Sequence, residues 1–212
     1  MKLNHLSTIV AFSSLLVAAP ALQASPIYPS SDLRVQDVTG NGHGDHAHAD
    51  DTTHEVLNVG DNAENQSWRA VIKFDLAEQA DAIRQADVIS FQATVRQRLL
   101  QVPKEWTFQI VSFPTEHAES VLISPAGDRT DDYSTEGEVV HSMAGGAIKS
   151  GEQLNVDVTL AAKEALETGV LVLRLQLDPA TNSDGHEDQI SFYAGSHEVN
   201  TPHLRPQLII NP

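Results

Sequence analysis

Long stretches of this chain alternate apolar and polar residues with a period of two. This pattern is typical of β-strands, because successive side chains of a strand point to opposite faces of a sheet. A strand with one apolar face has to bury that face against a second layer. The alternating segments are Leu33–Val38, Glu55–Val59, Trp68–Leu76, Ile89–Leu99, Trp106–Phe113, Val121–Ile123, Glu138–Ser142, Leu154–Val158, Leu171–Leu177, Gln189–Ala194 and Leu208–Ile210. Turn-forming residues separate them, so we predict an all-β fold, an antiparallel β-sandwich.

Helical signal is confined to two short stretches. Leu160–Glu167 is the clearer one, with Thr159 as its expected N-cap and Gly169 just past its end. A second turn of helix is expected near Glu78–Gln85. No repeat or linker divides the chain, so we expect a single domain over 55–212 that includes the strand and His/Asp/Gly-rich loop of 25–54.

The N-terminus reads as a secretory signal peptide over residues 1–24. Lys2 precedes an apolar run that extends from Leu6 to Ala19, and Ala24 suits cleavage before Ser25. The run is too short for a transmembrane helix, and no later stretch approaches about 18 consecutive apolar residues. We therefore expect an exported protein, periplasmic or extracellular, with no transmembrane span.

Charge and cysteine content exclude several classes of function. The 212 residues carry a formal net charge of -16 and include no Cys. Diffuse binding to nucleic acid needs a basic surface, so we expect no nucleic-acid partner. The absence of Cys excludes disulfides, thiol catalysis and Cys-ligated zinc.

The outward faces of three predicted strands concentrate basic and amide side chains. These candidate ligand-binding residues are Arg69, Lys73, Gln92, Arg96, Arg98 and Arg174. If the three strands are neighbours, the side chains form a cationic platform, and the planar Arg fork matches a carboxylate. The alternative is that these cations are solvated on an exposed sheet face and pair with nearby acids.

Aromatic side chains that stack on sugar rings are the other usual means of binding a glycan. Trp68 and Trp106 alternate with core residues, so we expect both to be buried. Tyr133 lies in the acidic segment 124–137, which we expect to be a surface loop together with 114–120. Tyr133 is therefore the better candidate for an exposed ligand-binding ring.

The segment Asp37–Asp45 has the oxygen spacing of a calcium loop. With Asp37 as position one, side-chain oxygens fall at positions one, three, five and nine, and Gly is at position six, where a sharp turn is needed. The candidate Ca²⁺ ligands are Asp37, Thr39, Asn41 and Asp45. Position twelve is His48 in place of the usual Glu, so Asp50 or Asp51 would have to replace that ligand.

The same segment is rich in histidine, which suggests two other interpretations. His43, His46, His48 and His54 offer imidazole ligands for Zn²⁺ or Cu²⁺. The segment is equally consistent with a solvated Gly/His/Asp turn that binds no metal, because Gly, Asn and Asp are ordinary turn residues. The sequence leaves all three interpretations open.

Catalytic motifs are missing from the sequence. It contains no G-x-S-x-G, H-E-x-x-H, phosphate-loop or Rossmann pattern. A His/Tyr pair could serve a polysaccharide lyase by general acid–base chemistry. His117, Tyr133, His141 and Tyr193 are of the right type, but their spacing does not require such a pair.

Three ordered segments resemble the DNRLRE domain, a group that overlaps carbohydrate-binding module family 96. The first is Leu57-Asn58-Val59-Gly60, followed by Trp68–Leu76 and then Ile83–Val88. The second is Val156-Asp157-Val158-Thr159, before a short helix and a leucine comb. The third is Phe192–Glu198 followed by Arg205-Pro206-Gln207-Leu208.

This resemblance implies a jelly-roll β-sandwich with one or two short helices that binds polysaccharide, anionic uronate polymers among them. We therefore expect an exported, non-catalytic polysaccharide-binding module, with calcium as a candidate stabilising ion. Two alternatives stay open. One is a periplasmic His-rich metal-binding protein, and the other is a small polysaccharide lyase.

Overall fold

The computed structural model describes residues 25–42, 44–49, 56–113, 133–134, 136–195 and 201–211. Several sequence expectations lie outside these residues: the signal peptide at 1–24, the strand at 121–123, and His43, His54 and His117. The side chains of His46 and His48 also lie outside what is described. Within the described residues, no helix is long and apolar enough to cross a membrane.

Eleven strands are present in the described part of the chain, and every pairing between them is antiparallel. In chain order they are β1 (Ser31–Asp37), β2 (His46–Ala49), β3 (Val56–Asp61), β4 (Ser67–Asp75), β5 (Val88–Leu99), β6 (Thr107–Ser112), β7 (Glu138–Ala144), β8 (Gln153–Asp157), β9 (Val170–Asp178), β10 (Asp188–Tyr193) and β11 (Gln207–Asn211).

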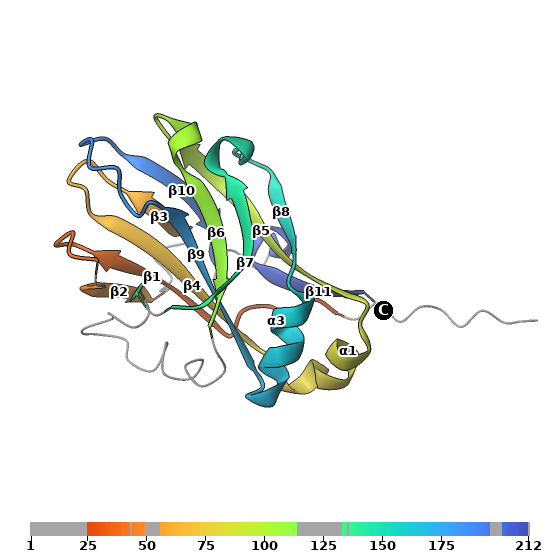
Figure 1. Cartoon of the computed structure of the whole chain (residues 1–212). Coiled ribbons are helices and arrows are strands. Elements are labelled where there is room, and N and C mark those ends of the chain that lie inside the picture. The colour runs from red at the N-terminus through yellow and green to blue at the C-terminus, as the bar shows by residue number, and fades with distance from the viewer. Residues whose placement is uncertain are drawn as a thin grey trace, which may run out of the picture.

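The strands form two layers (Figure 1). We call the layer with the order β2-β1-β4-β9-β6-β7 the β4–β9 layer. In the other, the β5 layer, β3 pairs with β10 and β10 with β5, while β8 and β11 flank the first half of β5. Only two residue pairs join β3 to β4 and so connect the layers. This arrangement confirms the predicted antiparallel β-sandwich of the jelly-roll type.

The core lies between the layers and is built from the alternating apolar side chains. The four alternating leucines of β9 between Leu171 and Leu177 are each at most 2% exposed. Phe74 of β4 meets Phe91 of β5 edge-on, with ring centroids 6.2 Å apart. Phe108 of β6 and Phe192 of β10 lie 5.6 Å apart. Since both pairs join the two layers, the period-two pattern predicted the inner faces correctly.

Two residues that alternation along the strands predicts to be in the core, Trp68 and Leu99, are not fully buried. Trp106 is 1% exposed as expected, but Trp68 is only half-buried, with the Arg34 guanidinium 5.1 Å from its ring centroid. The neighbour of Trp68 on β3 is Gly60, which has no side chain to cover the ring. Leu99, predicted to be on the inner face, is 41% exposed because the register of β5 against β10 shifts before it.

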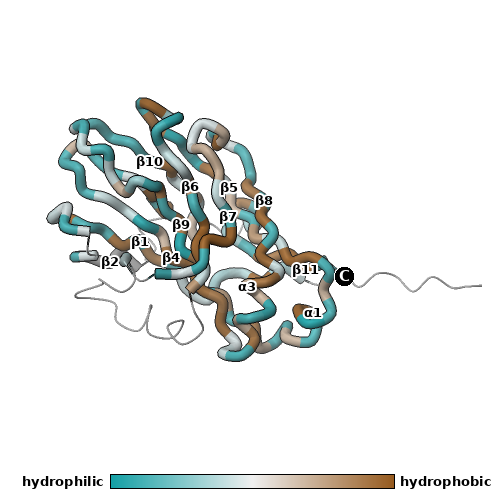
Figure 2. The backbone as a smooth tube through the Cα atoms, in the orientation of Figure 1, coloured by the Kyte–Doolittle hydropathy of each residue, from teal (hydrophilic) through white to brown (hydrophobic). Residues whose placement is uncertain are grey.

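The helices close one end of the sandwich (Figure 1). They are α1 (Ala80–Gln85) and α3 (Thr159–Glu164), with adjoining 3₁₀ turns at Ala77–Gln79 and Ala165–Glu167. Further 3₁₀ turns lie elsewhere, at Pro103–Glu105, Gly145–Ala147 and Pro202–Leu204. Figure 2 shows mostly hydrophilic loops at the opposite end and hydrophobic segments on the strands near α3.

Both predicted helices are confirmed, but the predicted cap is wrong. Thr159 is the first residue of α3, and its backbone N–H donates to Asp157 Oδ1 at 2.9 Å. The Thr159 hydroxyl accepts instead from the backbone N–H of Ile89, at 2.8 Å, which ties α3 to β5. The Thr159 hydroxyl also donates to Asp157 Oδ1, and this bond together with the one from the Thr159 N–H lowers the pKa of Asp157. Gly169 follows with φ +76°, a left-handed conformation that suits glycine after a helix.

Candidate functional site

The six strand residues predicted to bind a ligand do not form one surface. Arg69 and Lys73 on β4 and Arg174 on β9 belong to adjacent strands of the β4–β9 layer. The other three residues, Gln92, Arg96 and Arg98, belong to β5 in the opposite layer. The expectation of a single cationic platform is therefore corrected, because it required β5 to neighbour β4 and β9.

The β5 residues have separate surroundings. Gln92 Oε1 accepts from Gln207 Nε2 of β11 at 3.0 Å, and Arg96 is exposed. Arg98 Nη1 donates to the carbonyl oxygens of Gly146 and Ile148, at 3.2 and 3.0 Å. Arg98 thus holds the turn after β7 in place, a structural role that its predicted outward position did not suggest.

Arg69 and Arg174 converge on one carbonyl group. The Nη1 atoms of both donate to the backbone oxygen of Tyr133, in the case of Arg174 at 2.8 Å. The Arg69 guanidinium lies 4.1 Å from the centroid of the Tyr133 ring, and that of Arg174 lies 4.9 Å from the centroid of Phe113. Ser67 Oγ and the Tyr133 hydroxyl share a short hydrogen bond. The two cations are therefore positioned by the segment that contains Tyr133.

Tyr133 is buried, contrary to its expected role as an exposed stacking ring. It is 1% exposed and packs in a second apolar cluster on the outer face of the β4–β9 layer. The other buried members of this cluster are Leu33, Val35, Val71, Phe113 and Val172. Because these strand residues turn apolar side chains away from the main core, they need a cover, and Tyr133 provides part of it.

Burial shifts the pKa values of Arg69 and Tyr133. It lowers the pKa of Arg69, an effect opposed by Tyr133, Asp178 and Asp37, and it raises the pKa of Tyr133. Among the described residues, Arg69 makes no ion pair, and its buried Nε has no hydrogen-bond partner. Since a guanidinium stays protonated in proteins, Arg69 is a positive charge that no described carboxylate directly neutralises.

Amide side chains extend from Arg174 across the layer. Arg174 Nε donates to Gln176 Oε1 at 2.9 Å, and Gln176 Nε2 donates to Gln109 Oε1 at 2.8 Å. Both glutamines are half-buried, and the next residue in register, on β7, is the exposed Ser142. We call the surface formed by Arg69, Arg174, Gln176, Gln109 and Ser142 the Arg–Gln face. Gln109 was not singled out from the sequence, although its place between Phe108 and Ile110 marks it as outward-facing.

The predicted calcium loop closes the β1–β2 hairpin. The carboxylate of Asp37 is 2% exposed and accepts from the backbone N–H groups of Gly40 and Gly42, both at 2.7 Å. Asp45 Oδ2 accepts from the N–H groups of Val38 and Thr39, at 2.9 and 3.0 Å. The spacing of Asp37 and Asp45 is therefore explained by the turn, because their carboxylates accept hydrogen bonds from its backbone N–H groups.

Metal binding by this loop stays a prediction. Within the described ranges, the structure contains no group of three or more His, Cys, Asp or Glu residues placed to hold a metal ion. His43 and the side chains of His46 and His48 lie outside those ranges.

The residues considered for a lyase are not brought together. Tyr133 lies on the outer face of the β4–β9 layer, and His141 on β7 pairs with the buried Ile110. Tyr193 belongs to β10 in the opposite layer. No described His/Tyr pair from this set faces a common space.

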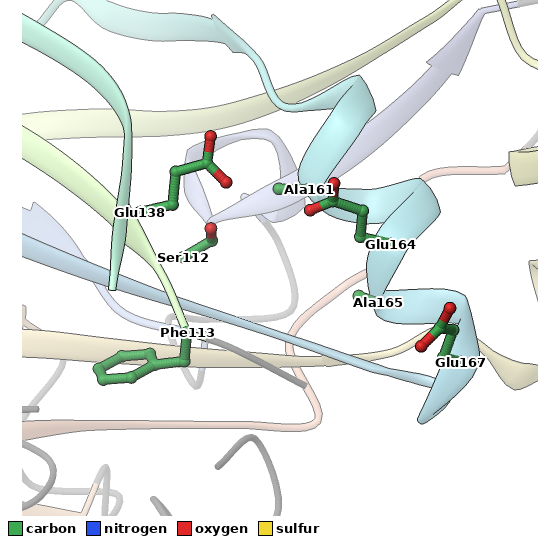
Figure 3. A pocket seen from close by; sticks show the side chains of 7 residues that line it. All are labelled: Ser112, Phe113, Glu138, Ala161, Glu164, Ala165 and Glu167. Atoms are coloured by element: carbon green, nitrogen blue, oxygen red, sulfur yellow. The ribbon is translucent and has the colours of Figure 1, made fainter. Parts of the chain in front are cut away.

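A cavity of ~410 Å³ lies between the β6–β7 strands and α3. Figure 3 shows Ser112 and Glu138 on the strand side and Glu164 and Glu167 extending from the helical side. A neighbouring cavity of ~520 Å³ shares Glu138 and is lined by the exposed Leu160. Three glutamates make the first cavity unfavourable for an anionic ligand, so the Arg–Gln face is the better candidate.

Comparisons with known proteins identify no family for this chain. No family model matches it, and no curated protein matches it. One structural match is Xylanase10C from Cellvibrio japonicus, a mutant in complex with xylopentaose, at 8% sequence identity and a TM-score of 0.38. The match covers 90% of this chain but spans only 28% of the length of the xylanase chain.

Proposed function

We propose that this protein is an exported, non-catalytic module that binds an anionic polysaccharide through the Arg–Gln face. The observation that carries the proposal is the pairing of Arg69 and Arg174 on adjacent strands, in a chain with a net charge of -16. Arg69 has no ion pair among the described residues. A uronate carboxylate would supply the missing negative charge.

The parts of the face have different tasks in this proposal. The two guanidinium groups are held by Tyr133 and set the local potential. Direct contact falls to the half-buried amides of Gln109 and Gln176 and to the exposed Ser142. Amide and hydroxyl groups both donate and accept, which matches the hydroxyls of a sugar ring.

Affinity electrophoresis in gels that contain alginate or polygalacturonate tests the proposal. Replacing Gln109 and Gln176 together by Ala should reduce retention, because each lost hydrogen bond costs about 1 kcal/mol and the pair roughly thirtyfold in Kd. The matched control is the double Ala variant at Gln92 and Gln207, an equivalent cross-strand amide pair on β5 and β11. Equal retention of both double variants would refute the proposed face.

The same preparation separates binding from catalysis. A lyase would release unsaturated sugars, which absorb ultraviolet light, whereas a binding module leaves the polymer intact. Retention should also weaken as salt is added, since added salt shortens the Debye length, about 8 Å at physiological ionic strength, and so screens the attraction between the arginines and the polymer. Release of unsaturated product by the purified full chain would overturn the non-catalytic assignment.

A further inference from the structure

A pair of acidic residues lies at the end of the sandwich far from the helices. Asp61 ends β3 and Asp188 begins β10, and the two are direct partners in the antiparallel register. Both are 0% exposed. Like charges directly opposite each other destabilise a sheet, and burial without compensation adds to that cost. Such a pair needs a positive charge or a proton nearby.

Asp188 has the hydrogen bonds of an ionised carboxylate. Its Oδ1 accepts from the backbone N–H of Gln101, and its Oδ2 accepts from Asn182 Nδ2 at 3.3 Å. Both oxygens of the Asp188 carboxylate therefore accept hydrogen bonds from N–H donors, and its charge acts on Asp61 across the pair.

Asp61 has no comparable partners. Both of its carboxylate oxygens are buried, and neither has a hydrogen-bond partner of good geometry among the described residues. Burial raises the pKa of Asp61 and the charge of Asp188 raises it further, while the Thr181 hydroxyl and nearby backbone N–H groups offset part of this rise. No basic side chain of the described residues acts on Asp61. A fully buried acid thus faces an ionised neighbour without a counter-charge.

We propose that the Asp61–Asp188 pair binds a hard divalent cation, for which Ca²⁺ is the best match. The oxygen ligands at this place are the two carboxylates and the Thr181 hydroxyl beside Asp61, while the Asn182 side chain donates through Nδ2 to Asp188 Oδ2. Ca²⁺ takes six to eight oxygen ligands in flexible geometry, whereas Zn²⁺ and Cu²⁺ favour imidazole or thiolate. The site differs from the predicted loop at Asp37, whose carboxylate accepts backbone N–H groups on both oxygens.

The position of the pair indicates what the cation does. The loops after β3 and before β10 meet here, where the Gly185 N–H donates to Asn65 Oδ1 at 3.3 Å. Gln101, just after β5, contacts Asp188. A cation at the pair would join three chain segments at this end of the sandwich, and it would stabilise the folded state over the unfolded one.

Thermal unfolding of the full chain, first in EDTA and then with excess Ca²⁺, tests the proposal. A ligand present at 100 times its Kd should raise Tm by about 5–10 °C in a chain of this size. Asp61→Asn and Asp188→Asn should lose this response, and Asp61→Asn should be at least as stable as the unchanged protein in EDTA. Asp184→Asn removes an exposed charge from the adjacent loop and should keep the response, as should Asp37→Asn.

Three results would overturn the proposal. The first is no Ca²⁺ response in the unchanged protein, in which case a proton on Asp61 balances the charge. The second is a response that Asp37→Asn abolishes and Asp61→Asn retains. The third is a larger response to Zn²⁺ than to Ca²⁺, which would indicate histidine ligands. If neither Asn variant at the pair folds, calorimetric titration of Asp37→Asn with Ca²⁺ decides: one retained site supports the proposal, and no binding refutes it.

Discussion

Replacing Arg174 by Lys tests whether this cation is a fixed part of the Arg–Gln face. Arg174 is 4% exposed and donates through Nη1 to Tyr133 and through Nε to Gln176, at 2.8 and 2.9 Å. Its guanidinium also lies 4.9 Å from the centroid of the Phe113 ring. Lys keeps the charge and most of the aliphatic stem, but its single ammonium group cannot reproduce a planar fork that reaches two acceptors and packs on a ring.

The expected loss of stability follows from these contacts. A hydrogen bond from a charged group contributes about 1.5–3 kcal/mol, and Lys retains one of the two. Part of the cation–π contact, which contributes about 0.5–2 kcal/mol, is lost as well. We expect a total of about 2–3 kcal/mol, which for a chain of this length lowers Tm by roughly 5–10 °C.

Urea unfolding followed by circular dichroism measures this difference directly. The matched control is Arg96→Lys, the same change at an exposed position on β5, which should alter the free energy of unfolding by less than about 0.5 kcal/mol. If Arg174→Lys were as stable as its control, Arg174 would not be anchored by Tyr133. Tyr133 would then not hold the arginines of the Arg–Gln face in position for the amides beside them.

Three further predictions concern single residues. Gly60→Ala should destabilise the fold by more than about 3 kcal/mol in urea unfolding, because φ is +117° and the new Cβ would lie 2.0 Å from the Asp188 carbonyl oxygen. The free energy of unfolding of the unchanged protein, measured in EDTA relative to that of Asp61→Asn, should fall as pH rises from about 4. The reason is that the pKa of Asp61 is raised in the folded state, so folding favours the protonated carboxyl. A difference between the two proteins that does not depend on pH would contradict this. Arg98→Ala should lower the free energy of unfolding by about 1–2 kcal/mol, because two hydrogen bonds to carbonyl groups are lost. Unchanged stability in urea unfolding would show that Arg98 does not hold the turn after β7.

The inner faces of the strands were predictable from the sequence because the signal is local. Alternation along β4, β5 and β9 depends on the burial of each strand and not on which strand lies beside it. The choice of neighbours is a long-range property, and it places β5 in the opposite layer from β4 and β9. For this reason Arg96 could be recognised as outward-facing but not assigned to a common surface with Arg69. The register shift in β5 then changes the surroundings of Arg98, since a shift of one residue exchanges the two faces.

The burial of Tyr133 was not predictable from the sequence, because its cause lies in other segments of the chain. An acidic segment with turn residues is typical of a surface loop, and the sequence offered no reason to treat its one tyrosine differently. The signal lay elsewhere, in the apolar residues Leu33, Val71 and Val172, which occupy the outer face of the β4–β9 layer. An outer face with several apolar residues indicates that another segment of the chain covers it.

The net charge sets a physical condition on the proposed binding. A chain with a charge of -16 repels a polyanion that approaches it. Beyond the Debye length, about 8 Å at physiological salt, this repulsion is weak because salt screens it. Within that distance the local arrangement of charge decides the interaction. Arg69 and Arg174 can favour a carboxylate only if they stay together at the face, and a flexible pair would turn toward nearby acids such as Asp178. Their shared hydrogen bonds to Tyr133 prevent this. In the proposed binding mode, the buried tyrosine therefore holds the arginines in place and does not touch the sugar.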